Sequence, residues 1–368
     1  MSTVGKYMGV TVANISKIDG KSKVNIAKIL GITLSSIHDW VTPTKLADPA
    51  NLPSGGGYGA AFSPDVTLLV VQTQFSPNII IYQISGTTFT KIADPADLPG
   101  AVGYDVKWSP DGNFFAMALN GAGNLAVYQK TGPTSFTKLP AGNFSSLPGG
   151  YSAYIAWSPD SSFLAVAGAD SKYIIIYQRS GTTFTRLADP DVLPPNVGRG
   201  CAFSPDGNFL AVGHNSGPFI TIYQRSGTTF TKLANPADLP PETVWSAKWD
   251  PSGTYLATVH SASPYITIYQ QSGTTFTKIS GVGNPDVLPT GFGQDVDWHP
   301  SGNYLAVGHS TSPFLTMYTR SGTTFTKMAD PATLPTGTGD TVAFSSDGQF
   351  LAVGSYSTPF ILIYQSSV

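Results

Sequence analysis

One short pattern, repeated seven times, restricts the fold of this chain more than any other feature. Each copy places an aromatic residue before a Ser-Pro-Asp turn or a close variant of it, and successive copies are 46 or 49 residues apart. The copies begin at Phe62, Trp108, Trp157, Phe203, Trp249, Trp298 and Phe344. A period of this length holds four short strands and their turns, as in one blade of a β-propeller. The 368 residues are therefore expected to form one ring of repeats.

The fourth repeat shows the expected order of strands within a blade. An inner strand at residues 199–203 runs into a turn with the sequence Ser-Pro-Asp-Gly, whose residues favour tight turns. Apolar and β-branched runs then predict the second, third and fourth strands, with a Gly-containing hairpin between the last two. These three strands are expected at residues 208–213, 219–224 and 230–234.

One blade is split between the two ends of the chain. A Thr-Lys-Leu-Ala-Asp-Pro segment, typical of the fourth strand, already occurs at residues 44–49, whereas the chain ends just after a third strand at Tyr364 and Gln365. Residues 41–47 are therefore expected to supply the outer strand of the last blade and to close the ring by hydrogen bonds. We predict an all-β protein: a seven-bladed β-propeller with a shared closing blade at residues 41–368, preceded by an extended segment at residues 1–40.

The propeller part resembles the WD40 superfamily. Its Ser-Pro-Asp-Gly turn, Phe-Leu-Ala second strand and Ile-Thr-Ile-Tyr third strand are similar to the pattern of that family across residues 41–368. The Trp-Asp pair that ends a WD40 blade is replaced by Tyr-Gln, and the Gly-His before the inner strand is missing. The resemblance therefore implies the architecture, and the hydrogen-bond network of the family is not carried over.

The first forty residues contain a different repeat, of 11 residues, in which Gly9, Gly20 and Gly31 open successive copies. Glycine at each start and the β-branched content favour short strands joined by turns over a coiled coil. Isoleucines recur in two columns, one of which Trp40 completes, and such a segment cannot bury both faces alone. It is either a mobile leader or a docking segment that pairs with other subunits. The docking residues would be Ile15, Ile18, Ile26, Ile29 and Ile37.

Two phrases in this segment, Asn-Ile-Ser-Lys-Ile-Asp-Gly and Asn-Ile-Ala-Lys-Ile-Leu-Gly, are similar to the N-terminal segments of bacteriophage structural proteins. The resemblance implies a virion protein, with other virion proteins or copies of itself as partners of residues 1–40. The start of the chain lacks a signal peptide, which is consistent with synthesis in the host cytoplasm and final placement in the virion.

Composition argues against several classes of function. The net charge is only −2 and the basic residues are scattered, so nucleic acid is not an expected partner. No apolar run approaches the ~20 residues that span a bilayer, so membrane insertion is not expected. Only 11% of the residues are charged, which leaves Ser, Thr, Asn, Gln and Gly to cover most of the surface.

Residues that suggest chemistry have simpler structural explanations. Most Asp residues recur in turns, where a carboxylate caps backbone N–H groups, although a calcium site in the Asp-Pro loops is an alternative. His214, His260 and His309 share one repeat position, but equivalent positions lie on different blades, which favours a structural role over a metal cluster. We expect no catalytic residues, no metal and no cofactor. A propeller hydrolase or lyase would have to use Asp105 or Asp295.

One column of the repeat varies while the neighbouring columns stay small or apolar. It lies four residues before each anchor, where the chain enters the inner strand near the mouth of the channel, and holds Tyr58, Tyr104, Ala153, Arg199, Trp245, Gln294 and Asp340. Tyr, Trp and Arg dominate binding hot spots, so the column predicts a partner-binding rim. The alternative is that these side chains only plug the channel.

These observations favour a non-catalytic bacteriophage virion structural or interaction protein, such as a tail, fibre, baseplate or capsid-decorating component. Its propeller would serve as a binding or adhesion platform for a host surface glycan or protein. The alternatives are a lectin-like carbohydrate-binding propeller and a cytosolic WD40-type protein–protein scaffold, because propellers host all of these functions.

Overall fold

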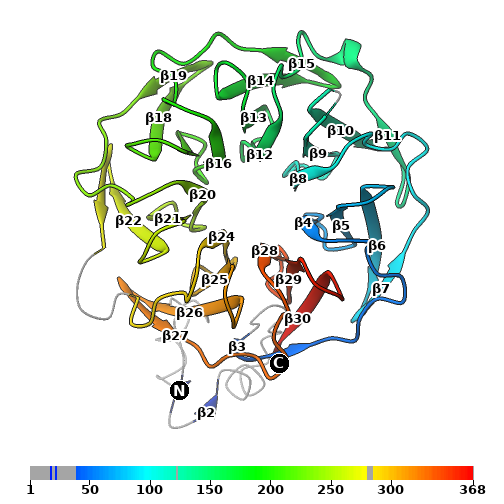
Figure 1. Ribbon diagram of the computed structural model, residues 1–368, viewed down its shortest axis with the longest axis vertical. Coiled ribbons are helices and arrows are strands. Elements are labelled where there is room, and N and C mark those ends of the chain that lie inside the picture. The colour runs from blue at the N-terminus through cyan, green and yellow to red at the C-terminus, as the bar shows by residue number, and fades with distance from the viewer. Residues whose placement is uncertain (1–16, 19–20, 23–38, 122, 280–284, 368) are drawn as a thin grey trace, which may run out of the picture.

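The computed structural model describes residues 17–18, 21–22, 39–121, 123–279 and 285–367, and all structural statements below concern these residues. They form seven four-stranded antiparallel sheets arranged as a ring around a central axis (Figure 1). The predicted all-β seven-bladed propeller is confirmed. Outside the blades lie a short antiparallel pair, β1 (Lys17–Ile18) with β2 (Lys21–Ser22), and one 3-10 turn, η3 (Ala141–Asn143).

Each blade presents its first strand to the axis and its fourth strand to the outside (Figure 1). The inner strands are β4 (Gly57–Phe62), β8 (Gly103–Trp108), β12 (Ser152–Trp157), β16 (Gly198–Phe203), β20 (Val244–Trp249), β24 (Gly293–Trp298) and β28 (Gly339–Phe344). The second strands are β5 (Leu68–Thr73), β9 (Phe114–Leu119), β13 (Phe163–Gly168), β17 (Phe209–His214), β21 (Tyr255–His260), β25 (Tyr304–His309) and β29 (Phe350–Ser355).

The third strands are β6 (Ile79–Ser85), β10 (Leu125–Lys130), β14 (Ile174–Ser180), β18 (Ile220–Ser226), β22 (Ile266–Ser272), β26 (Leu315–Ser321) and β30 (Ile361–Ser367). The outer strands are β7 (Thr88–Lys91), β11 (Phe136–Lys138), β15 (Thr183–Arg186), β19 (Thr229–Lys232), β23 (Thr275–Lys278), β27 (Thr324–Lys327) and β3 (Asp39–Lys45). The segments that join each outer strand to the next inner strand are called the linkers below.

Burial explains the different sequence patterns of the strands. The second strands are buried along nearly their whole length, because neighbouring blades cover both faces, and they read as continuous apolar runs. The Thr-Phe-Thr-Lys outer strands alternate instead, with only the Phe side chain turned inward. The hydrophobic core is therefore a set of layers between adjacent blades.

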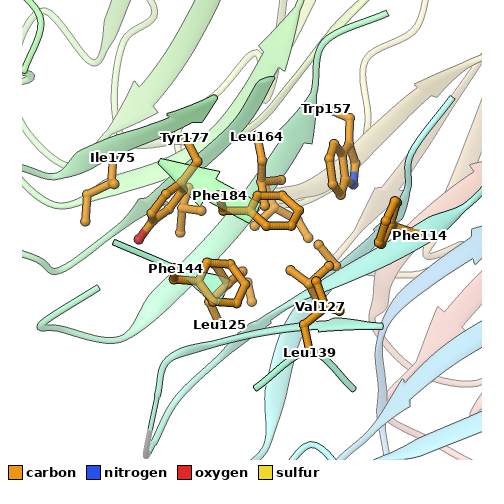
Figure 2. Packing of buried hydrophobic residues seen from close by; sticks show 14 residues of the cluster. Phe114, Leu125, Val127, Leu139, Phe144, Trp157, Leu164, Ile175, Tyr177 and Phe184 are labelled. Atoms are coloured by element: carbon orange, nitrogen blue, oxygen red, sulfur yellow. The ribbon is translucent and has the colours of Figure 1, made fainter. Parts of the chain in front are cut away.

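The layer between the second and third blades shows this packing (Figure 2). Trp157 and Phe184 of the third blade face Phe114 of the second, and the two phenylalanine rings meet edge to face. Phe144, from the linker between these blades, stacks on Phe184 with ring centroids 5.0 Å apart. The linker thus contributes its own side chain to the core.

A buried tyrosine on each third strand anchors the linker that enters the same blade. All seven side chains are fully buried, and each hydroxyl donates a hydrogen bond of 2.6–2.9 Å to a linker carbonyl 31 residues earlier. The tyrosines are Tyr82, Tyr128, Tyr177, Tyr223, Tyr269, Tyr318 and Tyr364. Six of them belong to the Tyr-Gln pairs that depart from the WD40 pattern, and Tyr318 is followed by Thr319 instead. The tyrosine at this position therefore supplies a linker clamp in every blade.

The aspartates of the Ser-Pro-Asp turns cap backbone groups, as expected. Asp65 accepts hydrogen bonds from the Ser63 hydroxyl and from the Thr67 backbone N–H and hydroxyl. Partial burial opposes ionisation of Asp65, but these hydrogen bonds outweigh it and hold its pKa well below the usual range. The turn at Asp206 shows the same arrangement with Ser204 and Asn208.

The last blade is completed by β3, which pairs antiparallel with β30. The predicted outer strand at residues 41–47 is observed two residues earlier, at Asp39–Lys45, and the ladder continues through a hydrogen bond of 2.8 Å from Leu46 N to Ile363 O. A register shift between Asp39 and Thr44 accommodates Pro43, which has no N–H to donate. Figure 1 shows β3 beside β30 at the edge of the ring.

Trp40 holds this closing strand in place. Its side chain is fully buried, its indole Nε1 donates a hydrogen bond of 2.9 Å to Gly348 O, and its ring meets Phe344 edge to face at 5.2 Å. The 11-residue pattern grouped Trp40 with the docking isoleucines, but in the structure it belongs to the propeller core. Of the predicted docking residues, Ile18 ends β1, whereas Ile15, Ile26, Ile29 and Ile37 lie outside the described residues.

Replacing Trp40 with Ala should therefore destabilise the whole ring. Loss of a fully buried Trp costs ~3–5 kcal/mol, so we expect the free energy of unfolding to fall by about this amount in urea denaturation followed by circular dichroism. Phe75→Ala, which removes a side chain that is 57% exposed, is the control and should change stability by less than ~0.5 kcal/mol. Equal stability of W40A and wild type would contradict this role of Trp40.

Candidate functional site

One end of the ring collects the loops that vary most between repeats. All seven inner strands start at this end, and the antiparallel order brings the loops between second and third strands to the same end. Backbone hydrogen bonds join the two sets, for example Gln74 N to Gly56 O at 3.2 Å and Asn120 N to Val102 O at 2.8 Å. This end is called the rim face below.

A cavity of about 430 Å³ opens at the centre of the rim face. Its lining includes all seven residues of the variable column: Tyr58, Tyr104, Ala153, Arg199, Trp245, Gln294 and Asp340. The seven blades thus place these residues around one space, and the six that were predicted as a partner-binding rim lie together.

Four further lining residues were missed by the sequence analysis: Asn120, Tyr151, Tyr154 and Tyr356. A second variable column, twelve residues after each anchor, would have found two of them, because it holds Gln74, Asn120, Ala169, Asn215, Ser261, Ser310 and Tyr356. Tyr151 and Tyr154 stand six and three residues before the anchor of the third blade, on either side of Ala153 in the sequence.

Aromatic rings form a continuous wall along part of the cavity. Tyr356 and Tyr58 meet edge to face at 5.2 Å, and the Tyr356 hydroxyl donates a hydrogen bond of 2.9 Å to the Tyr58 hydroxyl. Tyr58 contacts Tyr104 at 6.0 Å, and Tyr104 contacts Tyr151 at 6.2 Å. These edge-to-face contacts hold the rings in fixed orientations relative to one another.

Arg199 continues the wall beyond the tyrosines. Its guanidinium lies 4.6 Å from the centre of the Trp245 ring and 5.9 Å from the centre of the Tyr151 ring. Its Nε donates a hydrogen bond of 3.1 Å to Asn215 Oδ1, an atom of the second variable column. Stacking and this single hydrogen bond orient the guanidinium and leave its terminal nitrogens for another acceptor.

Asp340 lies three blades away from Arg199, on β28. Its Oδ2 is buried and has no hydrogen-bond partner among the described residues. Burial raises the pKa of this carboxyl group to about 8, because the charged form loses its water without gaining a partner. Asp340 is therefore mainly protonated at neutral pH, and its carboxyl group can both donate and accept a hydrogen bond.

The aspartates required by the hydrolase or lyase alternative lie below this cavity, in the channel, where backbone and side-chain groups of neighbouring blades engage them. Asp105 Oδ2 accepts a hydrogen bond of 3.1 Å from Ile155 N. Asp295 accepts hydrogen bonds from Ser246 Oγ at 2.6 Å and from Val342 N at 3.1 Å. Both carboxylates therefore join the inner strands of adjacent blades and have a structural role.

Lysine side chains accompany these aspartates along the channel. Lys107 forms an ion pair with Asp105, and although burial lowers the pKa of Lys107, the attraction of Asp105 and Asp295 outweighs it and raises that pKa. Burial raises the pKa of Asp105 and of Asp297. Lys107, Lys248 and Asp297 also line a second cavity, of about 290 Å³, on the side of the Ser-Pro-Asp turns.

His214, His260 and His309 hold strands together. Each is fully buried, and each Nε2 lies 2.9–3.0 Å from a threonine hydroxyl on the third strand of its own blade. Among the described residues no group of three or more His, Cys, Asp or Glu side chains is arranged to hold a metal ion. Within those residues the histidines therefore act as separate cross-strand pairs.

Exposed apolar side chains concentrate in the loops that end at the rim face. Among the described residues, every large apolar side chain that is exposed belongs to a linker or to a loop between second and third strands. They are Phe75, Leu98, Val192, Leu239, Val287, Leu288, Phe292 and Tyr356. These side chains therefore lie at the same end of the ring as the cavity.

Comparison with known proteins identifies the fold. A chain in the crystal structure of the mitotic checkpoint complex aligns with a TM-score of 0.66 at 16% identity, covering 92% of this chain and 99% of that one. A protein from Lactobacillus plantarum aligns with a TM-score of 0.62 at 17% identity, covering 78% and 89% respectively. No family model and no curated protein matches the sequence. The likeness therefore supports the β-propeller fold and goes no further.

No helix in the described part of the chain has the length and apolar character needed to cross a membrane.

The three histidines predict an acid-sensitive stability. Burial lowers the pKa of each from 6.5 to about 4, so the unfolded chain binds more protons between these values. Their stabilisation is complete above pH 6.5 and is lost as the pH falls toward 4, by on the order of 3 kcal/mol per histidine at pH 4. Denaturant titrations at several pH values should show a shallower loss in the triple variant H214Q/H260Q/H309Q. If the free energy of unfolding fell equally steeply with pH in the variant and in wild type, this role of the histidines would be contradicted.

Proposed function

We propose that this protein is a non-catalytic interaction protein that binds a partner at the rim face, with the cavity at its centre as the main contact. The observation that carries the proposal is the division of labour between the columns of the repeat. The linker-clamping tyrosines and the Ser-Pro-Asp turns recur because each blade needs them to fold. The variable column four residues before each anchor has no such structural role, and its residues gather around a single cavity. Its Tyr, Trp and Arg side chains are those that contribute most to binding energy.

Within this function we propose a place in a bacteriophage virion, as a tail, fibre, baseplate or capsid-decorating component. The segment predicted at residues 1–40, without Asp39 and Trp40, which belong to the propeller, would dock to other virion proteins or to copies of the same chain. The propeller would present the rim face to a host surface glycan or protein. The support is the likeness of the two isoleucine-rich phrases to phage structural proteins, together with the weakly charged, hydroxyl-rich composition.

A lectin-like role is the second candidate, and the aromatic wall favours it. The C–H groups of a sugar ring carry a small positive charge and pack well on the negative faces of aromatic rings. Gln294 and Asn120 in the same lining supply polar groups that fix a hydroxylated ligand. A sugar receptor and a place in the virion are compatible with each other.

Trp245→Ala tests the rim proposal. Full-length wild-type protein and the variant would be labelled with a fluorophore, and their binding to host cells would be measured by flow cytometry over a range of concentrations. We expect the variant to bind at least about tenfold more weakly, because it loses a hot-spot ring and the surface on which Arg199 stacks. Thr274→Ala, in an exposed hairpin of the same blade, should bind like wild type. Unchanged binding of W245A would refute the rim as the binding site.

The virion proposal has a separate test, mass spectrometry of purified particles. We expect peptides of this chain in particles banded on a density gradient, at a fixed ratio to the major capsid protein. Their absence from the particles, with the chain present in the host lysate, would overturn the virion role and leave the rim proposal standing.

A further inference from the structure

The charged groups of the rim cavity restrict the ligand that it can hold. Among the described residues, Arg199 and Asp340 are the only Asp, Glu, Lys, Arg or His side chains in its lining. Arg199 forms no ion pair with a carboxylate among the described residues, whereas Arg179 and Arg186 pair with Asp111 and Asp189. The guanidinium is nevertheless held in one orientation by Trp245, Tyr151 and Asn215. It is an oriented cation without its own counter-charge.

Asp340 does not supply that counter-charge. It lies on β28, three blades from β16, and its burial keeps it mainly protonated at neutral pH. The cavity therefore carries a net positive charge near pH 7 and offers a carboxylic acid hydrogen bond opposite the guanidinium. An anionic group placed against Arg199 would gain two parallel charge-assisted hydrogen bonds, the geometry for which a carboxylate is shaped.

The aromatic lining of the cavity indicates the shape and polarity of the rest of the ligand. Six aromatic rings line the cavity: Tyr58, Tyr104, Tyr151, Tyr154, Trp245 and Tyr356. Among the described residues, Ala153 is the only aliphatic side chain in the lining, so these residues form no slot for the Leu, Ile or Val anchor of a docked peptide. Aromatic faces with amide groups at their edges suit a flat, hydroxylated ring instead. The volume of about 430 Å³ falls within the ~300–1,000 Å³ of small-molecule sites.

We propose that the rim cavity binds a carboxylated sugar, of the uronic acid or sialic acid class, as the terminal residue of a glycan. Its carboxylate lies on the guanidinium of Arg199, its ring packs against Trp245 and the neighbouring tyrosines, and its hydroxyls meet Gln294, Asn120 and the carboxyl group of Asp340. The proposal rests on the proposed function, because it names the ligand of the same site.

Matched pairs of sugars separate this proposal from the general one. The full-length protein would be titrated calorimetrically with a glucuronic acid-terminated oligosaccharide and with its carboxyl-reduced, glucose-terminated counterpart, and then with a sialylated oligosaccharide and its carboxyl-reduced form. We expect at least one acid to bind about tenfold or more tightly than its reduced form, the advantage of a charge-assisted hydrogen-bonded pair. Arg199→Gln should abolish this difference, and Arg199→Lys should keep only part of it.

Lys172→Gln is the matched control for charge. It removes one positive charge from a loop between second and third strands, where Lys172 pairs with Asp189 outside the cavity. We expect it to retain the full preference for the acid. Equal affinity for acid and reduced sugar, or Arg199-dependent binding of an Asp/Glu-rich peptide with no sugar bound, would overturn the acidic-sugar proposal while the rim proposal stands. The rim proposal itself would fail on a different result, which is unchanged binding of W245A to cells.

The pH dependence gives an independent readout that does not depend on an Arg199 variant. Asp340 ionises as the pH rises through about 8, which adds a negative charge to the cavity and removes a hydrogen-bond donor. Affinity for the acidic sugar should therefore fall between pH 7 and 9. Asp340→Asn keeps a neutral donor and should show no such fall. A pH-independent wild type, or an equal fall in D340N, would contradict the assigned role of Asp340.

Discussion

The structure depends on the ladder between β3 and β30, because this ladder completes the last blade and so closes the ring. The hydrophobic core of a propeller lies between adjacent blades and not within a single one. Each second strand is buried only when a blade lies on either side of it, so every blade needs two neighbours. Without β3 the last blade would keep three strands and an open edge. Trp40 strengthens the ladder by filling the space beside Phe344 and by donating a hydrogen bond to Gly348 O. Residues more than 300 positions apart thus complete one hydrophobic layer.

Closure of the ring also sets the geometry of the candidate site. Seven inner strands start at the same level around the axis, so one residue from each blade reaches the same space. Below it, the carboxylates of Asp105 and Asp295 bond to the next inner strand and keep the strands at a fixed spacing. The rim residues can therefore vary freely, since the blade packing and the channel bonds maintain the scaffold beneath them.

Much of the fold and part of the candidate site could be predicted from the sequence, because the same residue types have the same structural role in each repeat. The anchors located the strands, and the split Thr-Lys-Leu-Ala-Asp-Pro element revealed the shared blade. The variable column identified the residues around the cavity. Trp40 was grouped with the 11-residue repeat, although it packs against Phe344 in the propeller core. The spacing of 11 residues gives no information about this contact between distant parts of the chain. Tyr151 and Tyr154 were missed because they stand in two other columns of the repeat, six and three residues before the anchor. The isoleucine columns stay a prediction.

The proposed function rests on the residues of the repeat that have no structural task. The tyrosine clamps, the turn aspartates and the buried histidines each have partners within a blade or between blades. Among the described residues, Arg199 has no partner of opposite charge and the buried Oδ2 of Asp340 has no hydrogen bond, and both residues line the cavity. A ligand gains the most binding free energy from polar or charged groups that have no partner in the free protein.

Ring closure by β3 is the claim that supports the others, and amide hydrogen exchange tests it most directly. The Leu46 N–H bonds to Ile363 O at 2.8 Å, and its equivalents in other blades, such as Ile92 to Ile81 O and Leu233 to Ile222 O, have the same bond within 0.1 Å. These equivalents are internal standards for an outer strand. Our account predicts that Leu46 exchanges as slowly as they do. Exchange of Leu46 within seconds, with the other blades protected, would show that the ring is not closed by this strand.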